Sequence, residues 1–235
     1  MKTILKALVG SRAHGLASES SDYDYRGIFV EPTTEILKIG GHPSRSTWIE
    51  RDESGAAKQD DTAWEIAHFL MLATKCNPSI LEVFAAPVIE ADEWGVELRT
   101  LLPCVWHPKG VRDAFVGYGL NQRKKMLEDK DGRPGKYAYS YLRVLASAES
   151  LLTSGILLVD MSHHPLYETL VRFKRWKDVS KGETIDVCGM WQSMVERAAE
   201  KCQHAPDLER VNDYLLRLRA QFWDAPAPPT VGRPQ

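Results

Sequence analysis

The feature that most constrains this chain lies near its start, where an apolar run ends at a glycine and a serine. Ile4–Val9 has the length and composition of a strand, and Gly10 ends it. Glycine lets a backbone approach a ligand closely, and the hydroxyl of Ser11 adds a hydrogen-bond donor. A short helix over residues 12–17 would point its free N–H groups and positive dipole end at this turn. The pattern predicts a seat for phosphate groups.

Two aspartates follow, two residues apart. Asp22 and Asp24 precede the apolar run Ile28-Phe29-Val30, which predicts a second strand. Alternate residues of a strand share a face, so both carboxylates would point the same way. Adjacent like charges repel unless a cation lies between them, and carboxylate oxygens suit Mg²⁺. We therefore expect a metal site beside the phosphate seat. The alternative, an acidic edge hairpin, leaves the turn at Gly10 unexplained.

The ordered combination of strand, Gly-Ser turn, short helix and Asp-x-Asp resembles the DNA polymerase β-type nucleotidyltransferase superfamily. Residues 10–15 (Gly-Ser-x-Ala-x-Gly) and 21–27 (Ser-Asp-Tyr-Asp-Tyr-Arg-Gly) are similar to a branch of predicted nucleotidyltransferases that includes an RNA-ligase-associated group. The resemblance implies an α+β fold, in which a small mixed-sheet nucleotidyltransferase domain precedes an α-helical domain and the active site lies in the cleft between them. From this first stretch we assign to nucleotide binding Gly10, Ser11, Arg12, His14 and Arg26.

The resemblance also implies a third catalytic carboxylate, on a strand beside the Asp-x-Asp pair, that accepts a proton from the attacking hydroxyl. In the resembled branch an aspartate precedes a helix that leads to an Asn-Pro-x-x-x-Glu motif, here residues 77–82. By that spacing Asp60 is the candidate and Asp61 the runner-up. The alternative is that both are helix N-terminal charges stabilised by the dipole. We interpret Glu82 as structural, bonded to a buried backbone group or arginine.

The rest of the chain has the pattern of helices. Thr62 followed by Glu65 is a capping-box pattern that predicts a helix beginning there. Beyond the prolines near residue 105, apolar spacing predicts helices over about 109–128, 136–154, 165–179, 184–203 and from 206 onward. We expect a nucleotidyltransferase domain at 1–105, a helical domain at 106–224, and a disordered tail at 225–235, which is rich in proline and small residues.

Two cations of the second half are candidates for the nucleotide site. Lys136 and Arg143 are seven residues apart, two turns along one helix face. The resembled branch has Lys, His and Arg at matching spacing, whereas Ser140 stands at the His position here. The two cations would close over the triphosphate from across the cleft. Alternatively, they are solvated charges or partners of Asp129 and Glu149.

Composition adds weaker constraints. The 235-residue chain has a net charge of −2, but residues 1–105 carry 10 Lys+Arg and 16 Asp+Glu, whereas residues 106–235 carry 20 and 16. A basic second half suits a polyanionic partner, although ordinary surface variation gives the same balance. The four cysteines lack Cys-x-x-Cys spacing, and we find neither a membrane-spanning run nor a leader-like segment. We expect a cytoplasmic protein without a zinc site or membrane association.

Together these features and the resemblance imply an Mg²⁺-dependent enzyme that moves an NMP from an NTP to a hydroxyl and releases pyrophosphate. Two Mg²⁺ ions, with Mn²⁺ as an alternative, would bind to Asp22, Asp24 and Asp60. The resemblance favours RNA or tRNA as the acceptor, with a protein or a small molecule as alternatives. A non-catalytic NTP-binding or antitoxin-like module is the competing class, and the presence of the carboxylates favours an active enzyme. The sequence leaves the NTP preference and oligomeric state open.

Overall fold

The N-terminal half is built on a small mixed sheet. The computed structural model describes residues 1–19, 21–40 and 62–224, and within these the sheet has four strands in the order β3-β2-β1-β4. The strands are β1 (Lys2–Val9), β2 (Asp24–Val30), β3 (Thr62–Glu65) and β4 (Val88–Ala91). β1 pairs antiparallel with β2 and β4, and β2 pairs parallel with β3. The β1–β2 register places Val9 opposite Asp24, so the first strand ends beside the second aspartate.

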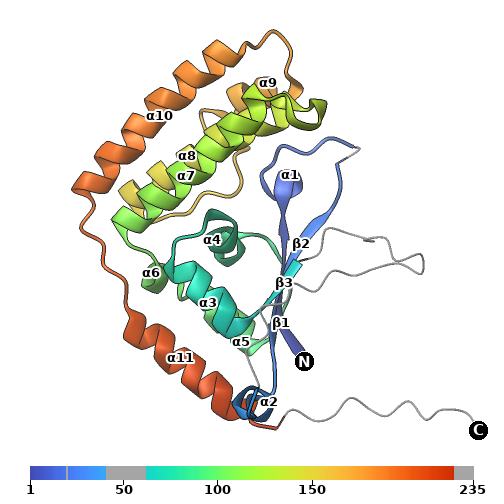
Figure 1. Cartoon of the computed structure of the whole chain (residues 1–235), viewed down its shortest axis with the longest axis vertical. Coiled ribbons are helices and arrows are strands. Elements are labelled where there is room, and N and C mark those ends of the chain that lie inside the picture. The colour runs from blue at the N-terminus through green and yellow to red at the C-terminus, as the bar shows by residue number, and fades with distance from the viewer. Residues whose placement is uncertain (20, 41–61, 225–235) are drawn as a thin grey trace, which may run out of the picture.

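Short helices complete this half of the molecule. They are α1 (Gly10–Ala13), α2 (Thr33–Leu37), α3 (Ile66–Thr74), α4 (Pro78–Ala85), α5 (Glu93–Arg99) and α6 (Leu102–Val105). α3, α4 and α5 lie together on one side of the sheet (Figure 1). The burial of apolar side chains from strands and helices, such as Ile28, Phe69 and Leu81, stabilises this packing.

The capping-box prediction at Thr62 was wrong. Thr62–Glu65 forms β3, which pairs with residues 26–29 of β2, and the helix begins only at Ile66. Glu65 is itself the residue that caps α3, since its carboxylate accepts a hydrogen bond of 2.8 Å from the N–H of Ala67. Strand pairing therefore overrides the local helix signal in this segment.

The second half is helical, as predicted. It contains α7 (Pro108–Leu127), the 3₁₀ turn η1 (Lys130–Gly132), α8 (Pro134–Ser154), α9 (Tyr167–Arg175), α10 (Lys181–Lys201) and α11 (Leu208–Gln221). α8 is the central helix, packed against α7, α9 and α10, and Figure 1 shows this group beyond the end of the sheet. α8 ends at Gly155, whose φ of +73° is a left-handed conformation that glycine adopts without strain. No helix among the described residues is both long and apolar enough to cross a membrane.

The last helix returns to the N-terminal half. α11 packs against α3 and α6, and Arg219 Nη2 lies 2.6 Å from Oε1 of the fully buried Glu65. The Thr33 hydroxyl donates to the carbonyl oxygen of Arg219 at 2.7 Å. One hydrophobic cluster includes residues of both halves. The division at residue 105 stays a prediction, and the predicted tail lies outside the described residues.

Candidate active site

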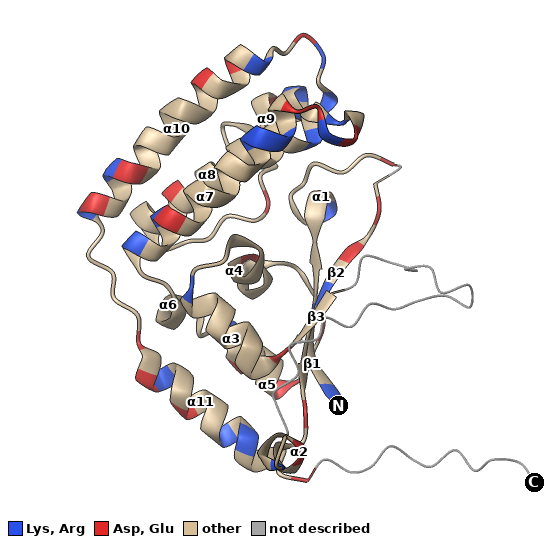
Figure 2. Cartoon of the chain, in the orientation of Figure 1, with Lys and Arg blue, Asp and Glu red and all other residues tan. Residues whose placement is uncertain are grey.

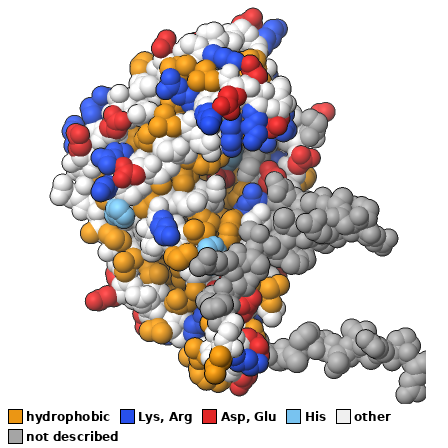
Figure 3. Space-filling view, viewed as in Figure 1, with side chains coloured by type: hydrophobic (Ala, Val, Ile, Leu, Met, Phe, Trp, Pro, Cys, Tyr) orange, Lys and Arg blue, Asp and Glu red, His pale blue; other side chains and the backbone are white. Residues whose placement is uncertain are grey.

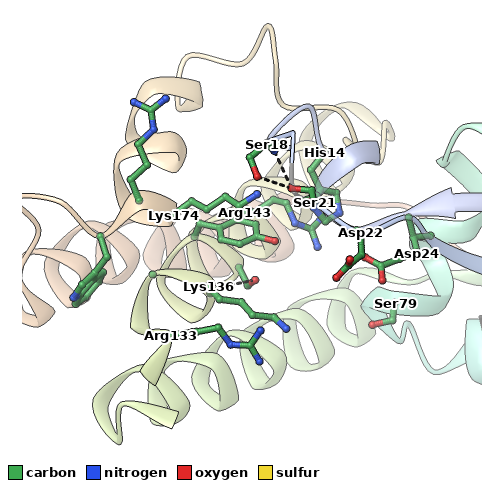
Figure 4. Close-up of a pocket in the computed structure, with 18 of the residues that line it drawn as sticks. His14, Ser18, Ser21, Asp22, Asp24, Ser79, Arg133, Lys136, Arg143 and Lys174 are labelled. Carbon is green, nitrogen blue, oxygen red and sulfur yellow. Dashed lines mark hydrogen bonds between the residues drawn. The ribbon is translucent and has the colours of Figure 1, made fainter. Parts of the chain in front are cut away.

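A cavity of about 1420 Å³ opens between the N-terminal half and the helices α8 and α9. Figure 4 shows Asp22 and Asp24 on one side of it, with Arg133, Lys136 and Lys174 across from them. The N-terminal half contributes most of the predicted residues, and the helical half contributes cations. The charged and polar side chains that line it include Ser11, His14, Asp22, Asp24, Arg26, Glu82, Arg133, Lys136, Arg143, Lys174 and Arg175.

Gly10 is required by the geometry of this cavity for two reasons. Its φ is +71°, a conformation that L side chains adopt only with strain. A Cβ atom on Gly10 would also lie 2.2 Å from Oδ2 of Asp24, far inside the contact distance. Any side chain here would therefore displace the carboxylate from its place beside the end of β1.

The predicted helix after Gly10 is shorter than expected. α1 covers residues 10–13 rather than 12–17, because Gly15, with a φ of +69°, turns the chain away. A Cβ on Gly15 would lie 2.5 Å from Oδ1 of Asp160. A single helical turn has little macrodipole, so the predicted phosphate seat would depend on the Gly10-Ser11 backbone and hydroxyl instead.

The two aspartates face the cavity side by side (Figure 4). β2 begins at Asp24, so Asp22 precedes the strand instead of sharing its face. Two carboxylates form a hard oxygen donor set that fits a divalent cation such as Mg²⁺. The described residues contain no cluster of three or more His, Cys, Asp or Glu side chains suited to a metal ion. The predicted third ligand, Asp60 or Asp61, lies outside those residues.

Arg12 and Arg26 occupy different positions. The guanidinium of Arg12 donates to the carbonyl oxygen of Ser21 at 2.7 and 3.1 Å and lies 3.9 Å above the ring centroid of Tyr23. Arg12 thus braces the loop before β2 and does not line the cavity, whereas Arg26 does. Arg26 also donates to the carbonyl oxygen of Tyr25 at 2.8 Å.

Glu82 connects the two halves beneath the cavity. Its Oε1 lies 2.8 Å from Nε2 of His14, and its Oε2 lies 3.3 Å from Nη2 of Arg143. Burial raises the pKa of Glu82, but the charge of Arg143 and the contact with His14 outweigh it and hold that pKa at about 2. Burial, followed by the charge of Arg143, lowers the pKa of His14, so we infer a neutral imidazole that donates from Nε2 to the carboxylate.

The interpretation of Glu82 as an arginine partner is confirmed. Arg143 is 8% exposed and lines the cavity, but its Nη2 donates to this carboxylate. Asp129, one of the partners suggested for it, instead pairs with Lys181 at 2.5 Å. Lys136 differs from Arg143 because its ammonium group is exposed and forms no hydrogen bond or ion pair with any described side chain.

Four cations opposite the aspartates form what we call the basic wall, namely Arg133, Lys136, Lys174 and Arg175. Figure 2 shows Lys and Arg gathered around α9 and the turn before α8. Burial lowers the pKa of Lys174, whose ammonium group donates to the carbonyl oxygen of Leu16. The site therefore has carboxylates on one side and positive charge on the other, an arrangement complementary to a metal-bound polyphosphate.

Sequence reasoning missed three members of the basic wall. Arg133 lies in a loop that the glycines and prolines indicated, but nothing local showed that this loop faces the aspartates. Lys174 and Arg175 are basic residues in the last turn of a helix, which is also their usual place on a solvated surface. Only the packing of α9 on α8 brings them to the cavity.

Comparison with known proteins identifies a family whose match spans the residues of this cavity. A model of the RNA repair pathway DNA polymerase beta family matches residues 1–217, which include the aspartates, Glu82 and the basic wall. An enterobacteria phage T4 protein, an uncharacterized 38.9 kDa protein of the nrdC-mobD intergenic region, is 26% identical over 156 residues. The uncharacterized protein YcgL of Bacillus subtilis strain 168 is 28% identical over 247 residues.

The two relatives differ in how much of each chain is matched. The Bacillus alignment covers 95% of this chain and 92% of YcgL. The phage alignment covers 64% of this chain and only 43% of the phage protein, so the chain spans less than half of that relative. With the family match extending from the first strand into α11, this chain belongs to the RNA repair pathway DNA polymerase beta family, a family of polymerase β-type nucleotidyltransferases.

Proposed function

We propose that this protein transfers a nucleoside monophosphate from an NTP to a terminal hydroxyl of RNA, such as tRNA, and releases pyrophosphate. The observation that carries the proposal is the pair Asp22 and Asp24 facing the basic wall across one cavity. The family description, an RNA repair pathway, supports RNA as the acceptor.

In this proposal Asp22 and Asp24 hold Mg²⁺, with Mn²⁺ as a substitute. The bound metal supplies charge neutralisation at the triphosphate and favours ionisation of the attacking hydroxyl. The acceptor oxygen forms a bond to the α-phosphorus, and the bond from that phosphorus to the oxygen bridging to the β-phosphate breaks. Asp60, or Asp61 as runner-up, accepts the proton of the hydroxyl.

The remaining residues bind and orient the NTP. Ser11, which lines the cavity beside the Gly10 turn, donates its hydroxyl to a phosphate oxygen. Arg26 and Lys136 neutralise the charge that develops on the departing pyrophosphate. Glu82 holds His14 and Arg143 in place at the cavity.

The test is pyrophosphate release from each of the four NTPs with Mg²⁺, with and without bulk cellular RNA. We expect release that depends on RNA, and label from an α-³²P NTP that becomes attached to the RNA. Asp22→Asn and Asp24→Asn should each lower turnover by more than about 100-fold, because a lost metal ligand costs several kcal/mol in the barrier. Both variants should keep the melting temperature of the wild type or exceed it, since carboxylate repulsion is relieved.

Asp186→Asn is the matched control, because Asp186 is exposed on α10 and does not line the cavity. It should retain wild-type turnover. NTP binding without pyrophosphate release under any condition would instead identify a binding module. Label found on protein or on a small molecule in a cell extract, and not on RNA, would retain the chemistry and replace the acceptor.

A further inference from the structure

The cavity is larger than an NTP site requires. Small-ligand clefts typically enclose roughly 300–1,000 Å³, and this one encloses about 1420 Å³. The segment before α8 and the end of α9 line it with Arg133, Lys174, Arg175 and Trp176. The space-filling view shows Lys and Arg side chains gathered over this region of the molecule (Figure 3). A triphosphate seated at Gly10 leaves this end available to a second ligand.

A close helix contact fixes these side chains relative to one another. A Cβ on Gly135, in the first turn of α8, would lie 2.5 Å from the carbonyl oxygen of Lys174 and 3.0 Å from Cβ of Trp176. Glycine at this position lets the end of α9 pack directly on the start of α8. Arg133, immediately before α8, is thereby brought to the same edge as Trp176.

Two guanidinium groups at this edge lack strong partners. Arg175 forms no hydrogen bond, ion pair or ring contact with any residue that the structure describes, and Arg133 is 3.8 Å from its nearest carboxylate, on Asp131. Other cations of this region are paired, since Arg172 binds Glu183 and Lys181 binds Asp129. A guanidinium group that is unpaired, as in Arg175, or only loosely paired, as in Arg133, suits the phosphates of an incoming ligand.

Trp176 adds an aromatic surface to this basic edge. Its φ is +52°, so a bulky residue occupies the left-handed position after a helix where glycine is usual. It lines the cavity, is partly buried, and has no aromatic or cationic partner for its ring among the described residues. Strained positions of this kind concentrate at ligand sites. An indole ring beside arginines is the combination that binds the bases and backbone of single strands.

We propose that this end of the cavity binds the single-stranded end of the acceptor RNA. Trp176 stacks on one unpaired base, and Arg133 and Arg175 contact flanking phosphates, so that the terminal hydroxyl reaches toward Asp22 and Asp24. The proposal rests on the proposed function and narrows its substrate class, because a base inside a blunt duplex has no free face for the indole ring. A strand with an unpaired end is the acceptor that this geometry favours.

The test measures binding of a fluorescein-labelled 12-nucleotide single-stranded RNA to the full chain in EDTA without NTP. Trp176→Ala should weaken binding roughly 5- to 150-fold, the range that corresponds to one base stack, and Trp176→Phe should restore most of it. Arg133→Ala combined with Arg175→Ala should weaken binding and reduce the slope of log K against log salt by about 1.4, for two phosphate contacts on a single strand. Lys177→Ala is the control, because Lys177 is exposed next to Trp176 but lies outside the cavity, and it should bind as the wild type does.

Any one of three binding results would overturn the proposal. They are unchanged RNA affinity in both the tryptophan and double-arginine variants, equal affinity of the wild type for a blunt duplex, and a loss of ATP affinity in Trp176→Ala equal to its loss of RNA affinity. The third result would assign the ring to the base of the NTP. If the wild type releases pyrophosphate in an RNA-dependent reaction and the variants have an unchanged KM for RNA, then this inference alone is contradicted. If RNA binding depends on Trp176 but no pyrophosphate is released, then the proposed function alone is contradicted.

Discussion

At the scale of single residues, the position of Asp24 depends on a missing side chain. Gly10 has a φ of +71°, and a Cβ there would lie 2.2 Å from the Asp24 carboxylate. Gly10→Ala should therefore lower turnover by at least about 100-fold by moving the proposed metal ligand, and lower stability by roughly 1 kcal/mol or more through backbone strain. Pyrophosphate release and a thermal melt, measured on one preparation, check both effects.

Gly117→Ala is the control for this substitution. Gly117 lies on an exposed face of α7, and a Cβ there would meet nothing within 4 Å. Alanine is favoured over glycine inside a helix, so this variant should keep full activity and gain a little stability. Gly10→Ala with more than half of wild-type turnover would contradict the assignment of Asp24 as a metal ligand held against the turn.

At the scale of elements, two cations of one helix separate into different roles. Arg143 on α8 is bound to Glu82 on α4, whereas Lys136 forms no close ion pair with a carboxylate within the described part of the chain. Arg143→Ala leaves the Glu82 carboxylate without its arginine and should destabilise the fold by roughly 3 kcal/mol or more. Lys136→Ala should leave the melting temperature unchanged and raise the Kd for ATP roughly 10- to 150-fold, by loss of a charge-assisted contact.

Thermal melts without ligand and ATP titrations of the two single variants check this separation. Equal losses of ATP affinity with unchanged melting temperatures would show that both cations serve the nucleotide, as their shared helix face first suggested. A stable Lys136→Ala variant with wild-type affinity would remove Lys136 from the nucleotide site.

The same elements show what the sequence could and could not predict. The apolar periodicity of residues 108–127 and 134–154 is local, so the helices α7 and α8 were predicted nearly to their ends. Pairing between β2 and β3 is not local, and it converted the predicted start of a helix at Thr62 into a strand. Gly10, Ser11, Asp22 and Asp24 lie close together in the sequence. The pattern alone could therefore predict that the two carboxylates lie beside the Gly-Ser turn. The partnership of Glu82 with Arg143 joins residues 61 positions apart, and only the packing of α4 near α8 creates it.

At the scale of the whole molecule, stability should depend on pH through His14 and Glu82. The pKa of His14 lies below 6.5 in the folded state, so the unfolded chain binds this proton first and stability falls as the pH drops below about 6.5. The pKa of Glu82 is about 2 when folded and 4.5 as a reference, so its contribution is present above pH 4.5 and is lost as the pH falls toward 2. That second loss corresponds to roughly 3 kcal/mol.

Urea unfolding at pH 8, 6, 4.5 and 3 checks this expectation. The free energy of unfolding should decrease at each acidic step, and Glu82→Gln should reduce the decrease between pH 4.5 and pH 3. Glu196→Gln is the control, because Glu196 is exposed on α10 and accepts a hydrogen bond only from neighbouring Gln192 among the described residues. An identical pH dependence in the two variants would show that Glu82 titrates alike in the folded and unfolded chains.

The return of α11 to the sheet also determines when this protein can complete its folding during synthesis. Glu65 is fully buried, and its partner Arg219 is added to the chain 154 residues later. At about 5–20 residues per second, a ribosome needs on the order of 10–30 s to make that intervening segment. Until α11 has been made, Glu65 lacks its arginine partner and the core on that side lacks the helix that packs against it. A nascent chain should therefore become protease-resistant in one late step, when α11 emerges from the ribosome.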